Sequence, residues 1–126
     1  MEQNTHPGIN PTLVGTPIRL APGESEVSLK TTQAMVADAR GLVHGGFTFG
    51  LADYAAMLAV NDPNVVLGAA NTRFLAPTRV GETMIATAKV SKEKGKKRIV
   101  SVEVKTDTVV FTGEFTCFVL DKHVLD

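Results

Sequence analysis

The residues whose types are best suited to take part in a reaction lie together between His44 and Asp53. Gly45 and Gly46 open a long apolar run that is typical of a helix, and the unpaired N–H groups at a helix start carry the positive end of its dipole. Without side chains, both glycines allow a carbonyl oxygen to approach these N–H groups closely. Asp53 lies among apolar residues, where loss of hydration should raise the pKa of its carboxyl toward a value useful for a general base. The set predicts a site that polarises a carbonyl group and either activates water or attacks the carbonyl directly.

Each of these residues also has a purely structural interpretation. The double glycine could simply permit tight packing of a helix against a sheet. Asp53 could be bonded to a neighbouring strand or across an interface. His44 could bond near the reacting group, but a lone histidine before a helix is also typical of a capping or packing residue. Asp38 could couple with Asp53 so that one of the two carboxyls holds a proton, or it could satisfy backbone groups of its own loop.

The spacing of Gly45 and Asp53 is too long for both to act on one carbonyl carbon within a single chain. Eight residues span about 12 Å along a helix, at about 1.5 Å per residue. Two antiparallel helices related by a two-fold axis remove this difficulty, because Gly45 of one copy then faces Asp53 of the other. The sequence therefore predicts a homodimer, or a dimer of dimers (a homotetramer), with two equivalent sites per dimer.

One helix and a set of strands must position these residues. The run from Gly45 to about Val60 predicts a buried helix that ends ahead of Asn61-Asp62-Pro63. Alternating patterns predict six strands, at residues 18–21, 24–31, 65–75, 82–90, 98–105 and 109–120. Residues 77–81 and 92–97 are expected to form hairpin-like connections, and residues 1–15 a loose lead-in with one short helix. A helix that is apolar on every side requires a curved antiparallel sheet wrapped around it, so the predicted fold class is α+β.

These motifs resemble one enzyme family. They are His44-Gly45-Gly46, the carboxylate of Asp53 nine residues after the histidine, and the segment Arg73-Phe74-Leu75-Ala76-Pro77 ahead of Gly81-Glu82. The pattern is similar to the hotdog-fold acyl-CoA thioesterases, particularly the phenylacetate-pathway and 4-hydroxybenzoyl-CoA thioesterases. The resemblance covers about residues 24–120 and implies a hotdog domain, an acyl-CoA substrate and a site shared between two subunits. The whole chain, residues 1–126, is expected to form this single domain. It also implies that the amide of Gly45 holds the thioester oxygen, and that Asp53 acts as base or nucleophile.

The resemblance has departures and suggests further candidates. Asp38 falls where many relatives carry Asn or Gln near the thioester, and Met57 and Ala76 stand where some relatives have hydroxyl residues. The residues expected to contact the acyl group or coenzyme A are Gly46, Phe49, Met57, Arg73, Phe74, Lys96 and Arg98. Lys96 and Arg98 belong to a dense basic cluster that could bind the phosphates of coenzyme A, or that could simply be a solvated turn.

The composition limits other possibilities. With 126 residues and 44% hydrophobic content, one domain is expected. Thirteen basic and thirteen acidic residues cancel, which disfavours nucleic-acid or membrane partners, and the expected compartment is the cytoplasm. No metal and no cofactor beyond the coenzyme A of the substrate are expected, and Cys117 is interpreted as an inert core thiol. Two alternatives stay open: a non-catalytic acyl-CoA-binding or sensing domain, and a hotdog dehydratase or hydratase acting on acyl thioesters.

Overall fold

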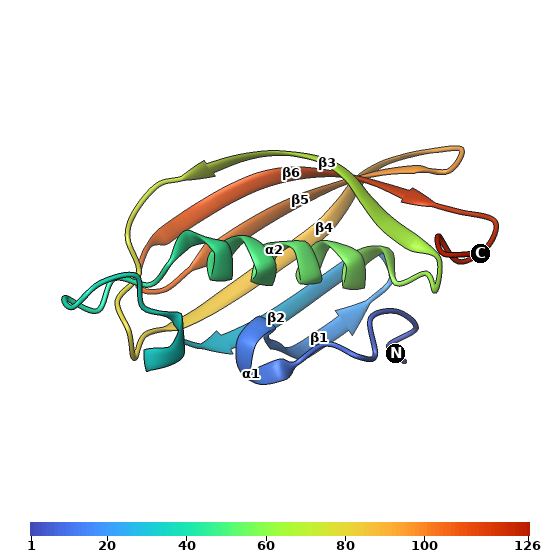
Figure 1. Ribbon diagram of the computed structural model, residues 1–126. Helices are drawn as coiled ribbons and strands as arrows, with labels where there is room; N and C mark the ends of the chain where they lie inside the picture. Colours follow the sequence, from blue (N-terminus) through green and yellow to red (C-terminus); the bar gives the residue numbers. More distant parts are fainter.

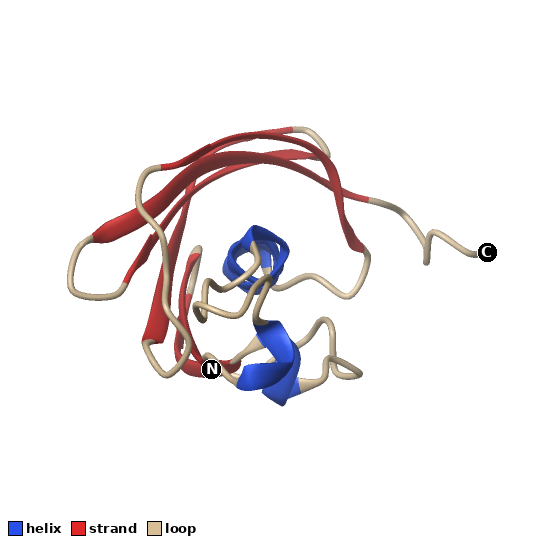
Figure 2. Cartoon of the chain, turned by 60° about the vertical axis from the view of Figure 1, so that its left-hand side comes forward, coloured by secondary structure: helices blue, strands red, loops and turns tan.

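The computed structural model describes residues 1–126, and one long helix lies inside a curved antiparallel sheet (Figures 1 and 2). The elements in chain order are α1 (Pro11–Val14), β1 (Thr16–Ala21), β2 (Glu24–Lys30), the 3-10 helix η1 (Gln33–Met35), α2 (Gly45–Val60), β3 (Val65–Phe74), β4 (Thr83–Lys94), β5 (Lys97–Lys105) and β6 (Val109–Val119). The six strands run in the order β1-β2-β4-β5-β6-β3, and each neighbouring pair is antiparallel. The expected hotdog architecture is confirmed.

The sheet follows the alternation that the sequence predicts. In β5, Val100, Val102 and Val104 are at most 3% exposed and face α2, whereas the residues between them point to the outer, convex face. The same alternation holds in β2 and in β6, where Phe115 and Cys117 are fully buried. Because side chains alternate along a strand, one face of each strand joins the core and the other meets solvent.

Helix α2 has the predicted bounds, from Gly45 to Val60. It ends at Asn61, which adopts a left-handed conformation (φ 54°) and whose N–H donates to the carbonyl of Met57 at 2.7 Å. Asparagine tolerates this conformation better than most residues, and Pro63 follows the stop. The helix packs most extensively against β4, β2 and β5. Its opposite side lies where the curve of the sheet is open (Figure 2).

Two predicted connections differ from the structure. Residues 77–81 do not form a hairpin, because β3 pairs only with β6 at the edge of the sheet, whereas β4 lies between β2 and β5. The segment instead crosses the end of the sheet, and Arg79 forms an isolated bridge with Leu42. Residues 92–97 do form a hairpin, but β4 extends to Lys94 and only a tight turn at Gly95 (φ 58°) separates it from β5.

The N-terminal segment, residues 1–15, is not the loose lead-in that the sequence suggested. Its predicted short helix is present as α1, where Asn10 caps the N-terminus by accepting from the N–H of Thr12 at 3.0 Å. The rest of the segment is hydrogen-bonded to α2: Gln3 donates to the hydroxyl of Tyr54 at 3.0 Å, and the N–H of Asn4 donates to the side chain of Asn61 at 2.7 Å. The segment therefore covers part of the side of α2 that the sheet leaves open (Figure 2). No helix of this chain has both the length and the apolar character needed to cross a bilayer.

Candidate functional site

The start of α2 presents backbone donors that the chain itself does not use. His44 occupies the N-cap position, but its side chain makes no capping hydrogen bond and is exposed. The first N–H bonded back to this residue is that of Phe47, whose N–H donates to the carbonyl of His44 at 3.0 Å. The amides of Gly45 and Gly46 precede this bond and stay at the positive end of the helix dipole. The structure therefore places two donors where the sequence predicted an oxyanion site.

Gly45 lines a pocket of about 410 Å³ at the start of α2. The pocket is lined by Leu42, Val43, Gly45, Thr48, Phe74, Leu75, Ala76, Pro77, Thr78 and Val110. A Cβ atom at Gly45 would lie 3.1 Å from the ring of Phe74, which also packs edge-on against Phe111 with the ring centroids 5.1 Å apart. Gly45 and Phe74, far apart in the sequence, thus form one site, and the lack of a side chain at Gly45 keeps it open.

Asp53 lies in the middle of α2 and is half-buried. Burial raises the pKa of its carboxyl from the ordinary value of 3.8 to about 6. The carboxyl makes no hydrogen bond or ion pair with another residue of the chain, and no buried side-chain oxygen in the protein lacks a partner. The oxygens of Asp53 are therefore reachable by solvent although the carboxyl is largely desolvated. Within one chain, no strand residue holds Asp53 in a hydrogen bond or an ion pair.

Asp38 has the structural role that the sequence left open. Its Oδ1 accepts from the backbone N–H groups of Arg40 at 2.9 Å and Leu42 at 3.2 Å, which closes the loop ahead of α2. The residue is exposed and lines a separate hollow of about 270 Å³ with Arg40, Leu42, Pro77 and Arg79. Burial alone accounts for the raised pKa of Asp53. The predicted coupling of Asp38 with Asp53 is therefore not present within one chain.

The remaining candidates fall in different places. Met57 is 1% exposed and belongs to the core, so it does not offer a surface to a substrate. Phe49 is half-buried and packs against Phe115, with the ring centroids 5.6 Å apart. Gly46 is exposed, and a Cβ there would lie 3.0 Å from the ring of His44. Of Met57, Phe49 and Gly46, only Gly46 is adjacent in the sequence to Gly45, which lines the pocket at the start of α2.

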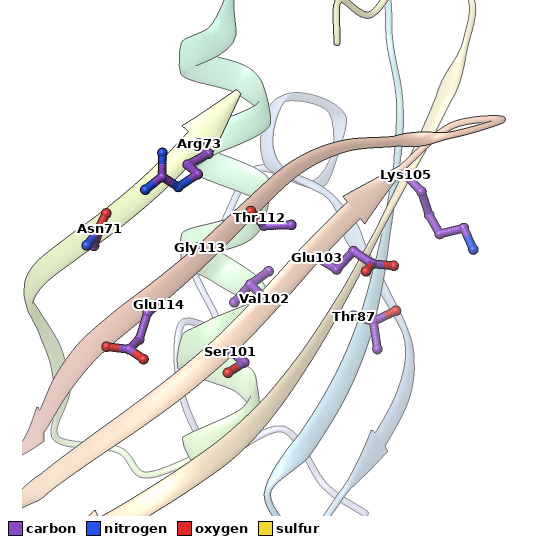
Figure 3. A pocket seen from close by; sticks show the side chains of 10 residues that line it. All are labelled: Asn71, Arg73, Thr87, Ser101, Val102, Glu103, Lys105, Thr112, Gly113 and Glu114. Carbon is purple, nitrogen blue, oxygen red and sulfur yellow. The ribbon is translucent and has the colours of Figure 1, made fainter. Parts of the chain in front are cut away.

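Arg73 lies on the other side of the sheet. It lines a hollow of about 660 Å³ on the convex face, together with polar side chains that include Glu103, Lys105 and Glu114 (Figure 3). Neighbouring strand residues point to opposite faces, so Arg73 turns outward where Phe74 turns toward α2. Within one chain, Arg73 therefore does not join Gly45 and Phe74 in the site.

Lys96 and Arg98 lie on the hairpin between β4 and β5, at the end of the molecule where α2 ends (Figure 1). The Nζ of Lys96 is 2.8 Å from Asp121, and the guanidinium of Arg98 is 3.2 Å from Glu93. The Lys96–Asp121 pair is exposed, and exposed ion pairs contribute little to stability, whereas the side chain of Arg98 is half-buried. Both residues lie at the opposite end of α2 from Gly45 of the same chain. They could therefore bind the phosphates of a coenzyme A at Gly45 only if that glycine belonged to a second copy of the chain.

Sequence reasoning did not predict that His6 and Asp53 would share a cavity. The N-terminal segment folds over α2, and the two residues line a small pocket of about 180 Å³ with Ile9, Val14, Gly50 and Tyr54. The local pattern around His6 gave no signal of this, since the contact depends on how the segment folds over α2. The histidine had no partner at metal-ligand spacing, and no group of three or more His, Cys, Asp or Glu side chains in the structure could hold a metal ion.

Comparisons with known proteins identify the family. The family model described as the thioesterase superfamily matches residues 40–111, more than half of the chain. The chain belongs to the thioesterase superfamily. The solved structure of an uncharacterized protein, PH1136 from Pyrococcus horikoshii, is similar over all of this chain and 98% of that one, with 55% identity and a TM-score of 0.99. The structure of PaaI from the E. coli phenylacetic acid degradation operon is similar over 86% of this chain and 80% of that one, with 25% identity and a TM-score of 0.79.

Two curated proteins that are similar to this chain have names that do not describe a thioesterase. A protein of Aquifex aeolicus named methylthioribose-1-phosphate isomerase is 55% identical over 123 residues, which is 96% of this chain but 27% of that protein. The transcription factor FapR of Thermoanaerobacter sp. strain X514 is 30% identical over 115 residues, 90% of this chain and 58% of FapR. The chain thus spans about a quarter of the first relative and just over half of the second.

Proposed function

We propose that this chain hydrolyses acyl-CoA thioesters as a side-by-side homodimer. The observation that carries the proposal is the Asp53 carboxylate, which is desolvated, free of partners and on the same helix as the unused amides of Gly45 and Gly46. Membership of the thioesterase superfamily supports hydrolysis of a thioester. A base with a pKa of about 6 is mostly ionised at neutral pH, yet it still accepts a proton well.

In the proposed reaction, the thioester oxygen accepts a hydrogen bond from the N–H of Gly45, at the start of α2. Asp53 takes a proton from a water molecule, whose oxygen attacks the carbonyl carbon. Negative charge then develops on the thioester oxygen, where the helix dipole and the amide donor stabilise it. The C–S bond breaks, coenzyme A leaves as the thiolate, and this thiolate takes up the proton that Asp53 holds, which returns Asp53 to its ionised form. The products are the free acid and coenzyme A.

The two groups come from different copies in this proposal. Gly45 and Asp53 are eight residues apart in a continuous helix, about 12 Å along its axis. Strand β3 lies at the edge of the sheet with no second neighbour, and Gly68, Ala69 and Ala70 are exposed along it. An exposed edge offers unpaired N–H and C=O groups to another strand. Antiparallel pairing of β3 with a second β3 would set two α2 helices side by side in opposite directions.

The same arrangement supports a role for the basic hairpin. In an antiparallel pair, the end of α2 in one copy lies near the start of α2 in the other. Lys96 and Arg98, at the end of the molecule where α2 ends, would then lie on the side of the partner's pocket (Figure 1). Contact with the phosphates of coenzyme A would replace their ion pairs with Asp121 and Glu93.

The decisive experiment is a thiol-release assay with short, long and aryl acyl-CoA substrates, on the wild type and on Asp53→Asn. We expect the wild type to release thiol from at least one substrate, and Asp53→Asn to lower kcat by about 100-fold or more. The wild-type kcat/KM should rise with pH up to about 6, because Asp53 must be ionised to accept the proton. Normal folding with unchanged thiol release in Asp53→Asn would remove Asp53 from the mechanism, and an enoyl product would favour a dehydratase.

A second candidate function is ligand sensing without turnover. The similarity to FapR, which is named as a transcription factor, favours it, and so does Asp38, whose carboxylate is held by its own loop. Under this alternative, acyl-CoA would raise the melting temperature of the protein without release of thiol from any substrate. The same assay therefore separates the two functions.

A further inference from the structure

The N-terminal segment places a histidine in the pocket of the proposed base. His6 and Asp53 line the same cavity of about 180 Å³, and its other walls are Ile9, Val14, Gly50 and Tyr54. The ring of His6 lies 6.3 Å from that of Tyr54, measured between centroids. Apart from Asp53 and the hydroxyl of Tyr54, the walls are apolar or a glycine. His6 is the one nitrogen-bearing side chain in this cavity.

The position of His6 is set by bonds between the N-terminal segment and α2. Asn61 at the end of the helix accepts from the N–H of Asn4 at 2.7 Å and donates to the carbonyl of Glu2 at 2.8 Å. Gln3 donates to the hydroxyl of Tyr54 at 3.0 Å and to the carbonyl of Thr5 at 2.9 Å. His6 itself has a left-handed backbone (φ 55°), which is uncommon for a residue with a side chain and persists only where the surroundings enforce it.

The hydrogen bond between Thr5 and His6 favours one tautomer of the imidazole ring. Thr5 is 3% exposed, and its Oγ1 lies 2.8 Å from Nδ1 of His6, the sole side-chain partner of this hydroxyl. A buried hydroxyl needs an acceptor for its hydrogen, and Nδ1 is the acceptor within reach. In the neutral ring, the proton then lies on Nε2. In this tautomer, the ring of His6 has an N–H donor at Nε2.

We propose that His6 is a positioning residue of the thioester site. Its Nε2–H donates a hydrogen bond to the attacking water and orients this water toward Asp53 of the same chain. The inference rests on the proposed function. Each complete site then consists of Gly45 from one copy with Asp53 and His6 from the other. Asp53 takes the proton of the water as before, and the imidazole stays neutral throughout, so the balance of the reaction is unchanged.

A neutral ring suits this role. Burial lowers the pKa of His6, so the imidazole is uncharged at neutral pH. A cation beside Asp53 would hold the pKa of that carboxyl down and weaken it as a base, whereas a neutral donor orients water without this penalty. The other titratable groups beside His6 are Tyr54 on α2 and His123 in the C-terminal segment, which lines a second hollow with His6. Neither Tyr54 nor His123 carries a negative charge at neutral pH that would favour the protonated ring of His6.

The histidine also lies outside the part of the chain that defines the family. The thioesterase superfamily model begins at residue 40, so it contains Gly45 and Asp53 but not the N-terminal segment. His6 is therefore a feature of this chain that family membership alone does not supply.

The kinetic test compares five variants in the thiol-release assay. His6→Ala should lower kcat by about tenfold with KM changed less than about twofold, because positioning of water affects the chemical step more than binding. His6→Asn should recover most of this loss, because asparagine tolerates the left-handed backbone and keeps an N–H donor. Thr5→Val should lower kcat and Thr5→Ser should not. His123→Ala is the matched control and should leave kcat unchanged.

A second measurement does not depend on turnover. The pKa of the His6 ring is followed by NMR in the wild type and in Asp53→Asn. Removal of the carboxylate that lines the same cavity should lower it by about half a unit or more, because a negative charge in that cavity favours the protonated ring. An unchanged His6 pKa, or a His6→Asn variant as slow as His6→Ala, overturns the role of His6. A shifted pKa together with no thiol release from any substrate instead overturns the proposed function alone.

Discussion

The central residue, Asp53, has a cost in stability that follows from its place on α2. Burial raises the pKa of its carboxyl from 3.8 to about 6, and nothing in the chain compensates the charged form. The folded chain thus holds the proton more tightly than the unfolded chain. Its free energy of unfolding should fall as the pH rises from about 4 to about 6, and should stay level above that. Functional groups often carry such a cost.

Asp53→Asn should therefore stabilise the protein at high pH. At about 1.36 kcal/mol per pKa unit, the shift from 3.8 to about 6 corresponds to at most about 3 kcal/mol at pH 8 and to almost nothing below pH 4. Urea denaturation of the wild type and the variant at pH 4, 6 and 8 would measure the difference. An equal free energy of unfolding at pH 8 would show that a partner stabilises the carboxylate.

Gly45→Ala tests the donor at the start of α2. The added methyl group would lie 3.1 Å from the ring of Phe74, at the place where the proposal puts the thioester oxygen. Phe74 is 56% exposed and can turn aside, so the change in melting temperature should be small. We expect kcat/KM to fall by about tenfold or more, since one displaced oxyanion donor costs at least this much. Full activity in Gly45→Ala would place the oxyanion elsewhere.

At the scale of elements, the junction between α1 and β1 joins the N-terminal segment to the core. Gly15 has a φ of 136°, and a Cβ there would lie 2.8 Å from Val27 and 3.0 Å from Leu51. Both neighbours are core residues with no exposed surface, so neither can move aside cheaply. This glycine therefore lets α1 and the segment before it approach α2 closely.

Gly15→Ala should destabilise the protein by about 2 kcal/mol or more, because the methyl group meets packed side chains and the backbone is unfavourable for alanine. Thermal unfolding would measure the change. Gly8→Ala, in the same segment, is the control, since a Cβ at Gly8 meets nothing within 4 Å. A melting temperature like that of the wild type in Gly15→Ala would show that the junction adapts.

At the scale of the whole molecule, the exposed edge of β3 determines whether a complete site exists. Ala70→Lys places a charge on this edge, where two copies would bring like charges together. We expect light scattering to show a monomer that is folded by circular dichroism, and thiol release to be lost. Thr87→Lys adds the same charge to an exposed position of the central strand β4 and should leave both unchanged. An active Ala70→Lys monomer would contradict the shared site.

The sequence alone determined the features that depend on local periodicity and on helix geometry. The apolar run after His44 predicted α2 with its bounds, the alternation in β2, β5 and β6 predicted their buried faces, and Gly45 and Asp53 emerged as candidates from residue type and spacing. Tertiary structure decided what depends on distant segments meeting. In the tertiary structure, β3 lies at the sheet edge beside β6, Arg73 lies on the convex face and Met57 is buried. The N-terminal segment lies over α2, so that His6 and Asp53 line one cavity. No local pattern encodes such contacts, because they follow from how the sheet curves and which side of the helix it leaves open.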